Sequence, residues 1–335
     1  MHKELISILV PFKNTSLFLT ECLESIFNQT YSNWELIIVD DNSTDNSLSI
    51  VRSYAENDSR IKLFKNKGSG IIDALQLAYS KSKGALITRM DSDDIMMENK
   101  LQSMHDDLIR HGKGHVALGL VKYFSDEGIS EGFAKYETWL NELTIKGSNY
   151  TEIYKECVIA SPCWMVHHED FDNCGAFNSK VYPEDYDLVF RFYKHNLVCI
   201  PSSKLLHHWR DYSYRSSRVQ DNYKHDMLLK LKLHHFLNLD YSNSKTLVLW
   251  GAGRKGKFSA KYFIKHDIDF IWICDNPKKI GKHIYNQELH DFKHLESLPN
   301  VQSIITVANP NAQNEIKAYL NKQNLQSMLD YFFFC

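Results

Sequence analysis

The chain has 335 residues and a formal net charge of −2, a length that can hold two domains with full cores. So small a charge excludes a general attraction to nucleic acid or to an anionic membrane, although a local basic patch remains compatible with it. The seven cysteines are odd in number and none has Cys-x-x-Cys spacing, which indicates reduced thiols and argues against a disulfide framework or a zinc site.

Strands and helices alternate along the first part of the chain. Apolar runs predict strands at 6–10, 34–39, 61–64 and 85–90, and apolar residues at helical spacing predict helices at 17–27, 46–54 and 70–80. This alternation is typical of an α/β fold, in which a mostly parallel sheet is covered by helices on both faces. Ligands of such sheets bind at the carboxyl ends of the strands.

Acidic residues follow two of these strands directly. Asp40 and Asp41 end the second strand, and the fourth strand runs into Asp91, Asp93 and Asp94. Because both clusters follow strand ends, we expect them to face one crevice. Carboxylate oxygens at this place suit a hard cation such as Mg²⁺ or Mn²⁺, the usual clamp on a nucleotide diphosphate. An isolated Asp-x-Asp is better explained as a solvated acidic turn, because the pattern is common by chance, so the assignment depends on its surroundings.

The middle of the chain is less regular. Strands are expected at 116–124, 163–167, 197–200 and 205–209, and a long helix at 221–237. Pro183 and the acidic residues after it suit the first turn of another helix. The polar, turn-forming residues 240–244 mark a domain boundary. We therefore expect a first domain at 1–217, a helical linker at 218–243 and a second domain at 244–335.

The last part of the chain predicts a small Rossmann-like α/β domain. Gly251-Ala252-Gly253-Arg254-Lys255-Gly256 stands between a predicted strand and a helix, and Asp275 follows the next strand. This pattern fits the dinucleotide fingerprint, which makes NAD binding one hypothesis. The short length of the domain and the lack of recognisable hydride-transfer residues favour an accessory domain without chemistry of its own.

Four segments in order resemble a known family. They read ISILVP at 6–11, VDDNSTD at 39–45, RMDSDD at 89–94 and EDYDL at 184–188. Together they look like the family 2 glycosyltransferases of the GT-A fold, over roughly residues 5–215. The resemblance implies an inverting, metal-dependent enzyme that moves a hexose from a UDP-sugar to an acceptor hydroxyl.

The resemblance also implies roles for single residues. Asp93 matches the direct metal ligand, and Asp91 matches a contact to the ribose or to a metal-bound water. Asp185 matches the general base, although acidic residues at a helix start are also explained by the helix dipole alone. Asp40 or Asp41 would accept the N3–H of uracil, with Asp41 slightly favoured, and an Asx-type turn is the alternative.

Four further positions complete the predicted site. Pro11 would line the uridine pocket through its backbone. Arg89 would touch the nucleotide or pair with a nearby carboxylate. His208 is a candidate third metal ligand and Arg210 a candidate contact to the diphosphate, because related enzymes place a His or Arg near this point. Packing or solvation would explain His208 equally well.

The layout of the whole chain is similar to the queuosine-tRNA galactosyltransferases. The segments that carry this similarity lie at 90–97, 136–144, 249–256 and 273–275. It implies galactose as the sugar and queuosine in tRNA as the acceptor, and a growing cell-envelope glycan is the alternative. A NAD-binding oxidoreductase and a non-catalytic sugar-nucleotide sensor are alternatives of another class.

The sequence shows neither a signal peptide nor an apolar run of roughly 18 residues. We therefore expect a cytoplasmic protein without an integral membrane segment, or one that is peripheral at the inner face of the membrane.

Overall fold

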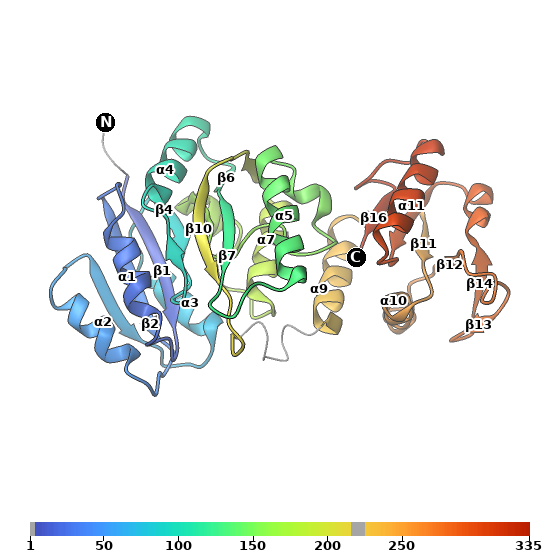
Figure 1. Cartoon of the computed structure of the whole chain (residues 1–335). Helices are drawn as coiled ribbons and strands as arrows, with labels where there is room; N and C mark the ends of the chain where they lie inside the picture. The colour runs from blue at the N-terminus through green and yellow to red at the C-terminus, as the bar shows by residue number, and fades with distance from the viewer. Residues whose placement is uncertain (1–3, 216–224) are drawn as a thin grey trace. The chain divides into compact units, whose positions relative to one another are not determined.

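The structure, a computed structural model, describes residues 4–215 and 225–335 (Figure 1). The chain divides into two compact units, Met1–Tyr150 with Val158–Val219 and Thr151–Cys157 with Gln220–Cys335. The helix expected as a linker, α9 (His225–Leu239), falls within the second unit, as does the short segment Thr151–Cys157. Each unit has a large sheet of its own.

A sheet of seven strands organises the first unit, in the order β3-β2-β1-β4-β8-β6-β9. Its strands are β1 (Ile6–Phe12), β2 (Trp34–Asp40), β3 (Ile61–Lys65), β4 (Leu86–Arg89), β6 (His115–Leu118), β8 (Trp164–His167) and β9 (Val198–Ile200). The strands β3, β2, β1 and β4 are parallel, whereas β8 runs antiparallel to both of its neighbours. The large, mainly parallel sheet confirms the α/β class predicted from the sequence.

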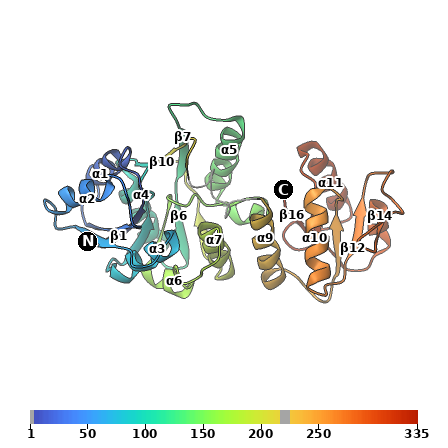
Figure 2. The same ribbon diagram turned by 90° about the horizontal axis from the view of Figure 1, so that it is seen from below.

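Helices cover both faces of this sheet. They are α1 (Leu19–Phe27), α2 (Ser47–Ala55), α3 (Ile71–Lys81), α4 (Lys100–His111), α6 (His168–Asn173) and α7 (Glu184–Lys194). On one face, Leu23 of α1, Val51 of α2 and Met104 of α4 share a buried cluster with Ile8 of β1. The other face carries α3, which packs against β1 and β2 and lies on the same side as α6 and α7 (Figure 2). The carboxyl ends of the strands therefore form the edge at which loops can build a site.

A second, smaller sheet corrects one prediction. It has the order β5-β10-β7, and its strands are β5 (Ile95–Met96), β10 (Leu205–Arg210) and β7 (Leu120–Phe124). The single strand predicted at 116–124 is wrong, because the chain breaks at Gly119 into β6 and β7, which belong to different sheets. Glycine permits the break because a Cβ at this position would lie 2.6 Å from the Cβ of Leu206. Helix α5 (Glu131–Lys146) then packs on β7.

We expect Gly119→Ala to lower the free energy of unfolding by about 1–3 kcal/mol, because the added methyl group overlaps Leu206 in a packed core. The midpoint of urea unfolding, followed by circular dichroism, measures this loss. Gly132→Ala in the first turn of α5 is the matched control, since its Cβ would meet nothing closer than the Ser130 Oγ at 3.9 Å. Equal unfolding midpoints for the two variants would contradict the predicted overlap between a methyl group at position 119 and Leu206.

The second unit has a sheet of six strands in the order β13-β14-β12-β11-β15-β16. Its strands are β11 (Thr246–Trp250), β12 (Ile271–Cys274), β13 (His283–Ile284), β14 (Gln287–Asp291), β15 (Val301–Ile305) and β16 (Tyr331–Phe333), and its longer helices besides α9 are α10 (Arg254–Lys265) and α11 (Pro310–Lys322). The β13–β14 hairpin was not expected from the sequence. Within the described ranges 4–215 and 225–335, no helix combines the length and the apolar character needed to cross a bilayer.

Candidate functional site

The register of the parallel strands brings three strand ends to one edge. Phe12 at the end of β1 pairs with Asp40 at the end of β2, and Leu9 pairs with Arg89 at the end of β4. The loops that follow also touch, since the Thr15 Oγ1 lies 3.1 Å from the Ser92 Oγ. Both acidic clusters therefore follow strand ends on one edge of the sheet.

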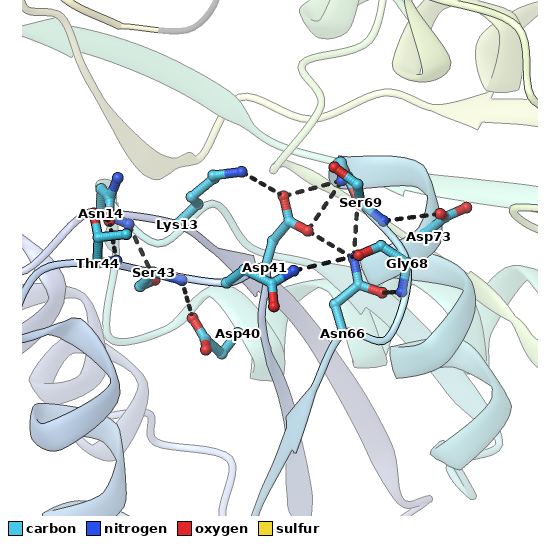
Figure 3. Close-up of polar contacts among 12 residues, drawn as sticks. Lys13, Asn14, Asp40, Asp41, Ser43, Thr44, Asn66, Gly68, Ser69 and Asp73 are labelled. Carbon is cyan, nitrogen blue, oxygen red and sulfur yellow. Dashed lines mark hydrogen bonds and ion pairs between the residues drawn. The ribbon is translucent and has the colours of Figure 1, made fainter.

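Asp40 and Asp41 have different partners (Figure 3). The Oδ1 of Asp40 accepts a hydrogen bond from the backbone N–H of Ser43 at 2.9 Å, which closes a local turn after β2. The carboxylate of Asp41 instead accepts from the Asn66 Nδ2 at 2.7 Å and from the Gly70 N–H at 3.0 Å. Asp40 thus shapes the turn, whereas Asp41 faces the loop that follows β3.

Arg89 joins the end of β4 to the start of α7. Its Nη2 lies 2.9 Å from the Asp91 Oδ1, and its Nη1 lies 3.0 Å from the Glu184 Oε1. Burial raises the pKa of Asp91, but the Arg89 and Arg215 cations outweigh burial, and the pKa falls below its ordinary value. Of the two roles considered for Arg89, the structure shows the pairing with carboxylates.

Asp185 lies in the first turn of α7, next to Glu184 in the chain, and is partly exposed. Burial and the Glu184 charge raise the pKa of Asp185 to about 7, and Asp91 acts in the same direction. Asp91 also raises the pKa of Asp93. Arg89 pairs with both Asp91 and Glu184, the neighbour of Asp185, so one cation joins the two distant acidic motifs.

Asp93 and Asp94 leave negative charge at the loop that follows β4. The Tyr212 hydroxyl donates to the Asp93 Oδ2 at 2.7 Å. Burial, together with the neighbouring Asp94, raises the pKa of Asp93 to about 6. Burial also raises the pKa of Asp94 to about 7. Carboxyl groups with raised pKa values would be stabilised in their charged form by a bound cation, so the oxygen-only donor set fits a hard divalent ion.

A buried chain of polar groups supports Asp94. The Lys100 Nζ lies 2.5 Å from the Pro162 carbonyl oxygen and 3.3 Å from the His207 Nδ1, and the His207 Nε2 lies 2.9 Å from the Asp94 Oδ2. Burial lowers the pKa of His207 well below its ordinary value, so its ring is neutral. Because a lysine ammonium only donates, the His207 Nδ1 accepts and its Nε2–H donates to Asp94. The chain fixes the orientation of the acidic loop.

His207, and not the predicted His208, meets this loop. His208 lies opposite Lys122 on β7, and its ring centroid is 5.9 Å from that of Phe124. Neighbouring residues of a strand point to opposite faces, which separates the two histidines. No group of three or more His, Cys, Asp or Glu in residues 4–215 and 225–335 is placed to hold a metal ion. The role of His208 as a third metal ligand beside Asp91 and Asp93 stays a prediction.

Arg210 holds the backbone of the acidic loop. Its Nε donates to the Asp93 carbonyl oxygen at 2.7 Å, and its backbone N–H donates to the Asp94 Oδ1 at 2.8 Å. The guanidinium also pairs with Glu21 and lies 4.4 Å from the centre of the Phe124 ring. These contacts hold Arg210 at the acidic loop, and its contact to the diphosphate stays a prediction.

Four residues of the site were not singled out from the sequence. They are Asn66, Tyr212, Arg215 and Tyr182, whose hydroxyl would lie 3.2 Å from a Cβ placed on Gly70. Burial opposes the charge on Arg215, but Asp94 and Asp93 outweigh it and raise the pKa of Arg215 above its ordinary value. No motif marks these positions. For Tyr182, the nearest signal is its place beside the acidic segment 184–188.

Comparison with known proteins identifies the family. The sequence model described as Glycosyl transferase family 2 matches residues 7–175, about half of the chain. The chain belongs to this family. The match covers the segments of Asp41, Asp91 and Asp93 and ends before Asp185.

Curated relatives agree with this family. Glycosyltransferase GlyG of Streptococcus pneumoniae is 31% identical over 198 residues, which are 57% of this chain and 65% of GlyG. The UDP-Glc:alpha-D-GlcNAc-diphosphoundecaprenol beta-1,3-glucosyltransferase WfgD of Escherichia coli is 39% identical over 103 residues, 30% of this chain and 40% of WfgD. The chain thus matches less than two thirds of the length of either relative.

The fold also has counterparts among solved structures. Residues 1–349 of S. aureus TarS, crystallised with UDP-GlcNAc, superpose with a TM-score of 0.55 at 18% identity, covering 78% of this chain and 72% of that one. This likeness, together with the mainly parallel sheet, confirms the predicted GT-A type of fold.

Proposed function

We propose that the first unit transfers a hexose from a UDP-sugar to an acceptor hydroxyl, with inversion at the anomeric carbon. The observation that carries the proposal is the pairing of Arg89 with both Asp91 and Glu184, the neighbour of Asp185, because it joins the two acidic motifs. Family membership supports the class of reaction. The UDP-GlcNAc in the TarS crystal supports a uridine diphosphate donor.

In this proposal Asp41 reads the base. Its carboxylate, which is 5% exposed, would accept the N3–H of uracil, and the backbone of Pro11 at the end of β1 would line the same pocket. Asp40 is 1% exposed and bonds to Ser43 three residues on, so of the two carboxylates Asp41 is the proposed reader. A carboxylate acceptor favours uridine over cytidine, whose N3 carries no hydrogen.

We expect Asp41→Asn to raise the KM for the UDP-sugar about tenfold or more, because a hydrogen bond to a charged group is lost. Initial rates at varied donor concentration measure this change. Asp58→Asn is the matched control, since Asp58 precedes β3 at the opposite edge of the sheet and pairs with Arg60. An unchanged KM in Asp41→Asn would show that another residue recognises the uracil base.

We propose Asp93 and Asp91 as the protein ligands of Mg²⁺ or Mn²⁺. Two carboxylates suffice for this role, because such ions commonly complete their shell with water and substrate phosphates. When bound, the cation would neutralise charge on the leaving diphosphate. Arg89 keeps Asp91 charged and oriented, while Arg210 and His207 hold the loop that carries both ligands.

Asp185 is the proposed general base. It would take the proton from the acceptor hydroxyl as that oxygen attacks the anomeric carbon, so the reaction needs no enzyme nucleophile. Its pKa of about 7 suits a group that must accept a proton near neutral pH. Glu184 suits this role less well, because it is only 4% exposed and its Oε1 pairs with Arg89 at 3.0 Å.

For the acceptor, the name of WfgD supports a sugar on a lipid diphosphate, as in the assembly of envelope glycans. Queuosine in tRNA, with galactose as the sugar, stays a prediction from the sequence resemblance. One segment of that resemblance also has a structural explanation, because Tyr136 and Trp139 of α5 pack against the core of the first unit.

The decisive experiment measures UDP release from a panel of UDP-sugars with Mn²⁺ or Mg²⁺, first alone and then with two acceptors. The acceptors are an undecaprenyl-diphosphate-linked GlcNAc and purified tRNA, with products analysed by mass. Metal-dependent UDP release that rises with one acceptor supports the proposal and identifies the acceptor. Donor binding without release under any condition would support the sensor and overturn the proposal.

A further inference from the structure

The second unit contains a pocket that the transfer reaction does not use. Its volume is about 430 Å³, within the usual range for small-molecule sites. The carboxyl ends of three parallel strands line it: Gly251 and Gly253 follow β11, Asp275 follows β12 and Thr306 follows β15. The chain builds the sheet outward from β11 in both directions, so the pocket lies where the strand order reverses. This is the place where open α/β sheets bind ligands.

The fold requires glycine at two of the three glycine positions in the loop, but not at the third. Gly251 has a φ of +115°, which side chains rarely adopt, and a Cβ on Gly256 would lie 2.0 Å from the Gly251 carbonyl oxygen. Both positions are therefore required by the fold itself. Gly253 has an ordinary φ of −81°, and a Cβ there would meet no atom within 4 Å. Neither strain nor packing explains Gly253, whereas a side chain at this position would occupy space at the pocket.

The polar groups around the pocket suit the two ends of a nucleotide. No side chain caps the first turn of α10, so its N–H groups are open to an anion, and Arg254, Lys255 and Lys279 also line the pocket. The Lys279 Nζ donates to the Ala252 carbonyl oxygen at 2.8 Å, which ties the loop to the end of β12. The exposed carboxylate of Asp275 suits the vicinal hydroxyls of a ribose.

We propose that this pocket binds a ribonucleoside phosphate, with the phosphate at the start of α10 and the ribose at Asp275. The ligand could come from a free nucleotide or from a dinucleotide such as NAD, which share this chemistry. The inference does not rest on the transfer reaction, because every residue that it uses belongs to the second unit.

Calorimetric titration of the full chain with ADP, UDP and NAD⁺ tests the proposal. The protein carries Asp41→Asn, so that UDP binding at the donor site of the first unit is weakened. We expect at least one probe to bind with one equivalent per chain. Gly253→Val and Asp275→Ala should each weaken that binding about tenfold or more, because they fill the phosphate cradle or remove a charged acceptor.

Two controls make the result specific. Asp269→Ala removes an exposed carboxylate just before β12, at the opposite edge of the sheet, and should leave the affinity unchanged. Gly253→Val in the otherwise wild-type chain should leave UDP release from the donor unchanged, which separates a failure of this proposal from a failure of the proposed function. The tightest of the three probes identifies the source of the nucleotide. No binding of any probe at about 1 mM, or equal affinity in Gly253→Val, would overturn the proposal.

Discussion

Asp185→Asn is expected to lower kcat for sugar transfer by about 10² to 10⁴, the usual contribution of a general base, and to leave donor binding intact. The amide has the shape of the carboxylate but cannot accept the acceptor's proton. Asp185 lies next to Glu184, which pairs with Arg89, so the start of α7 keeps its anchor in the variant. Separate measurements of kcat and of the dissociation constant of the UDP-sugar distinguish loss of the base from loss of the donor site.

The pH dependence offers a second test of the same residue. Because the pKa of Asp185 in the fold is raised to about 7, the wild-type rate should rise as the pH passes through 7 and the carboxyl loses its proton. A raised carboxyl pKa also means that the charged form disfavours the fold, so the neutral asparagine should be at least as stable as wild type at pH 8. The variant should lack the pH-dependent rise. Retained turnover, or a lost donor affinity, would refute the role.

Asp93→Ala is expected to lower transfer more than about 10²-fold and to abolish its dependence on Mn²⁺, because stabilisation of the leaving diphosphate is lost. Asp93 is 9% exposed and lies among like charges, so the protein itself should remain folded without this carboxylate. Mn²⁺ binding to the protein with UDP, followed by electron paramagnetic resonance, gives a readout independent of turnover.

Tyr212→Phe is the matched control for Asp93. It removes the hydroxyl that donates to the Asp93 Oδ2 at 2.7 Å and keeps the aromatic ring. This variant should retain metal-dependent transfer, because the metal ligand is still present. Turnover close to wild type in Asp93→Ala would show that Asp93 is not a metal ligand.

The strand ends and the acidic residues on them could be predicted, because both depend on local patterns. The β1, β2 and β4 strands read as apolar runs, and a parallel sheet brings their ends to one edge. The pairing of Arg89 with Glu184 could not be predicted in the same way, since it joins residues 95 positions apart. Asn66 follows β3 without any motif, so only the fold shows that it faces Asp41.

The choice between His207 and His208 shows a further limit. Alternation along a strand says only that the two side chains point in opposite directions. The face that each one occupies depends on the register of β10 against β7, and this register shifts between Leu205 and His207. The glycine at position 119 is similar, because the atoms that leave no room for a Cβ there belong to Leu206 on β10. In both cases the deciding contact is not local in sequence.

The segment Thr151–Cys157 means that the chain passes between the two units three times. The Tyr154 ring stacks on Phe334 with centroids 5.1 Å apart, and the Lys232 Nζ donates to the Lys155 carbonyl oxygen at 3.0 Å. A fragment that stops at residue 217 would carry Tyr154 into solvent without these neighbours, while the remaining piece would lack part of its own core. Truncation at one boundary therefore cannot isolate either half intact, and a recombinant catalytic half would need residues 151–157 replaced by a short polar bridge.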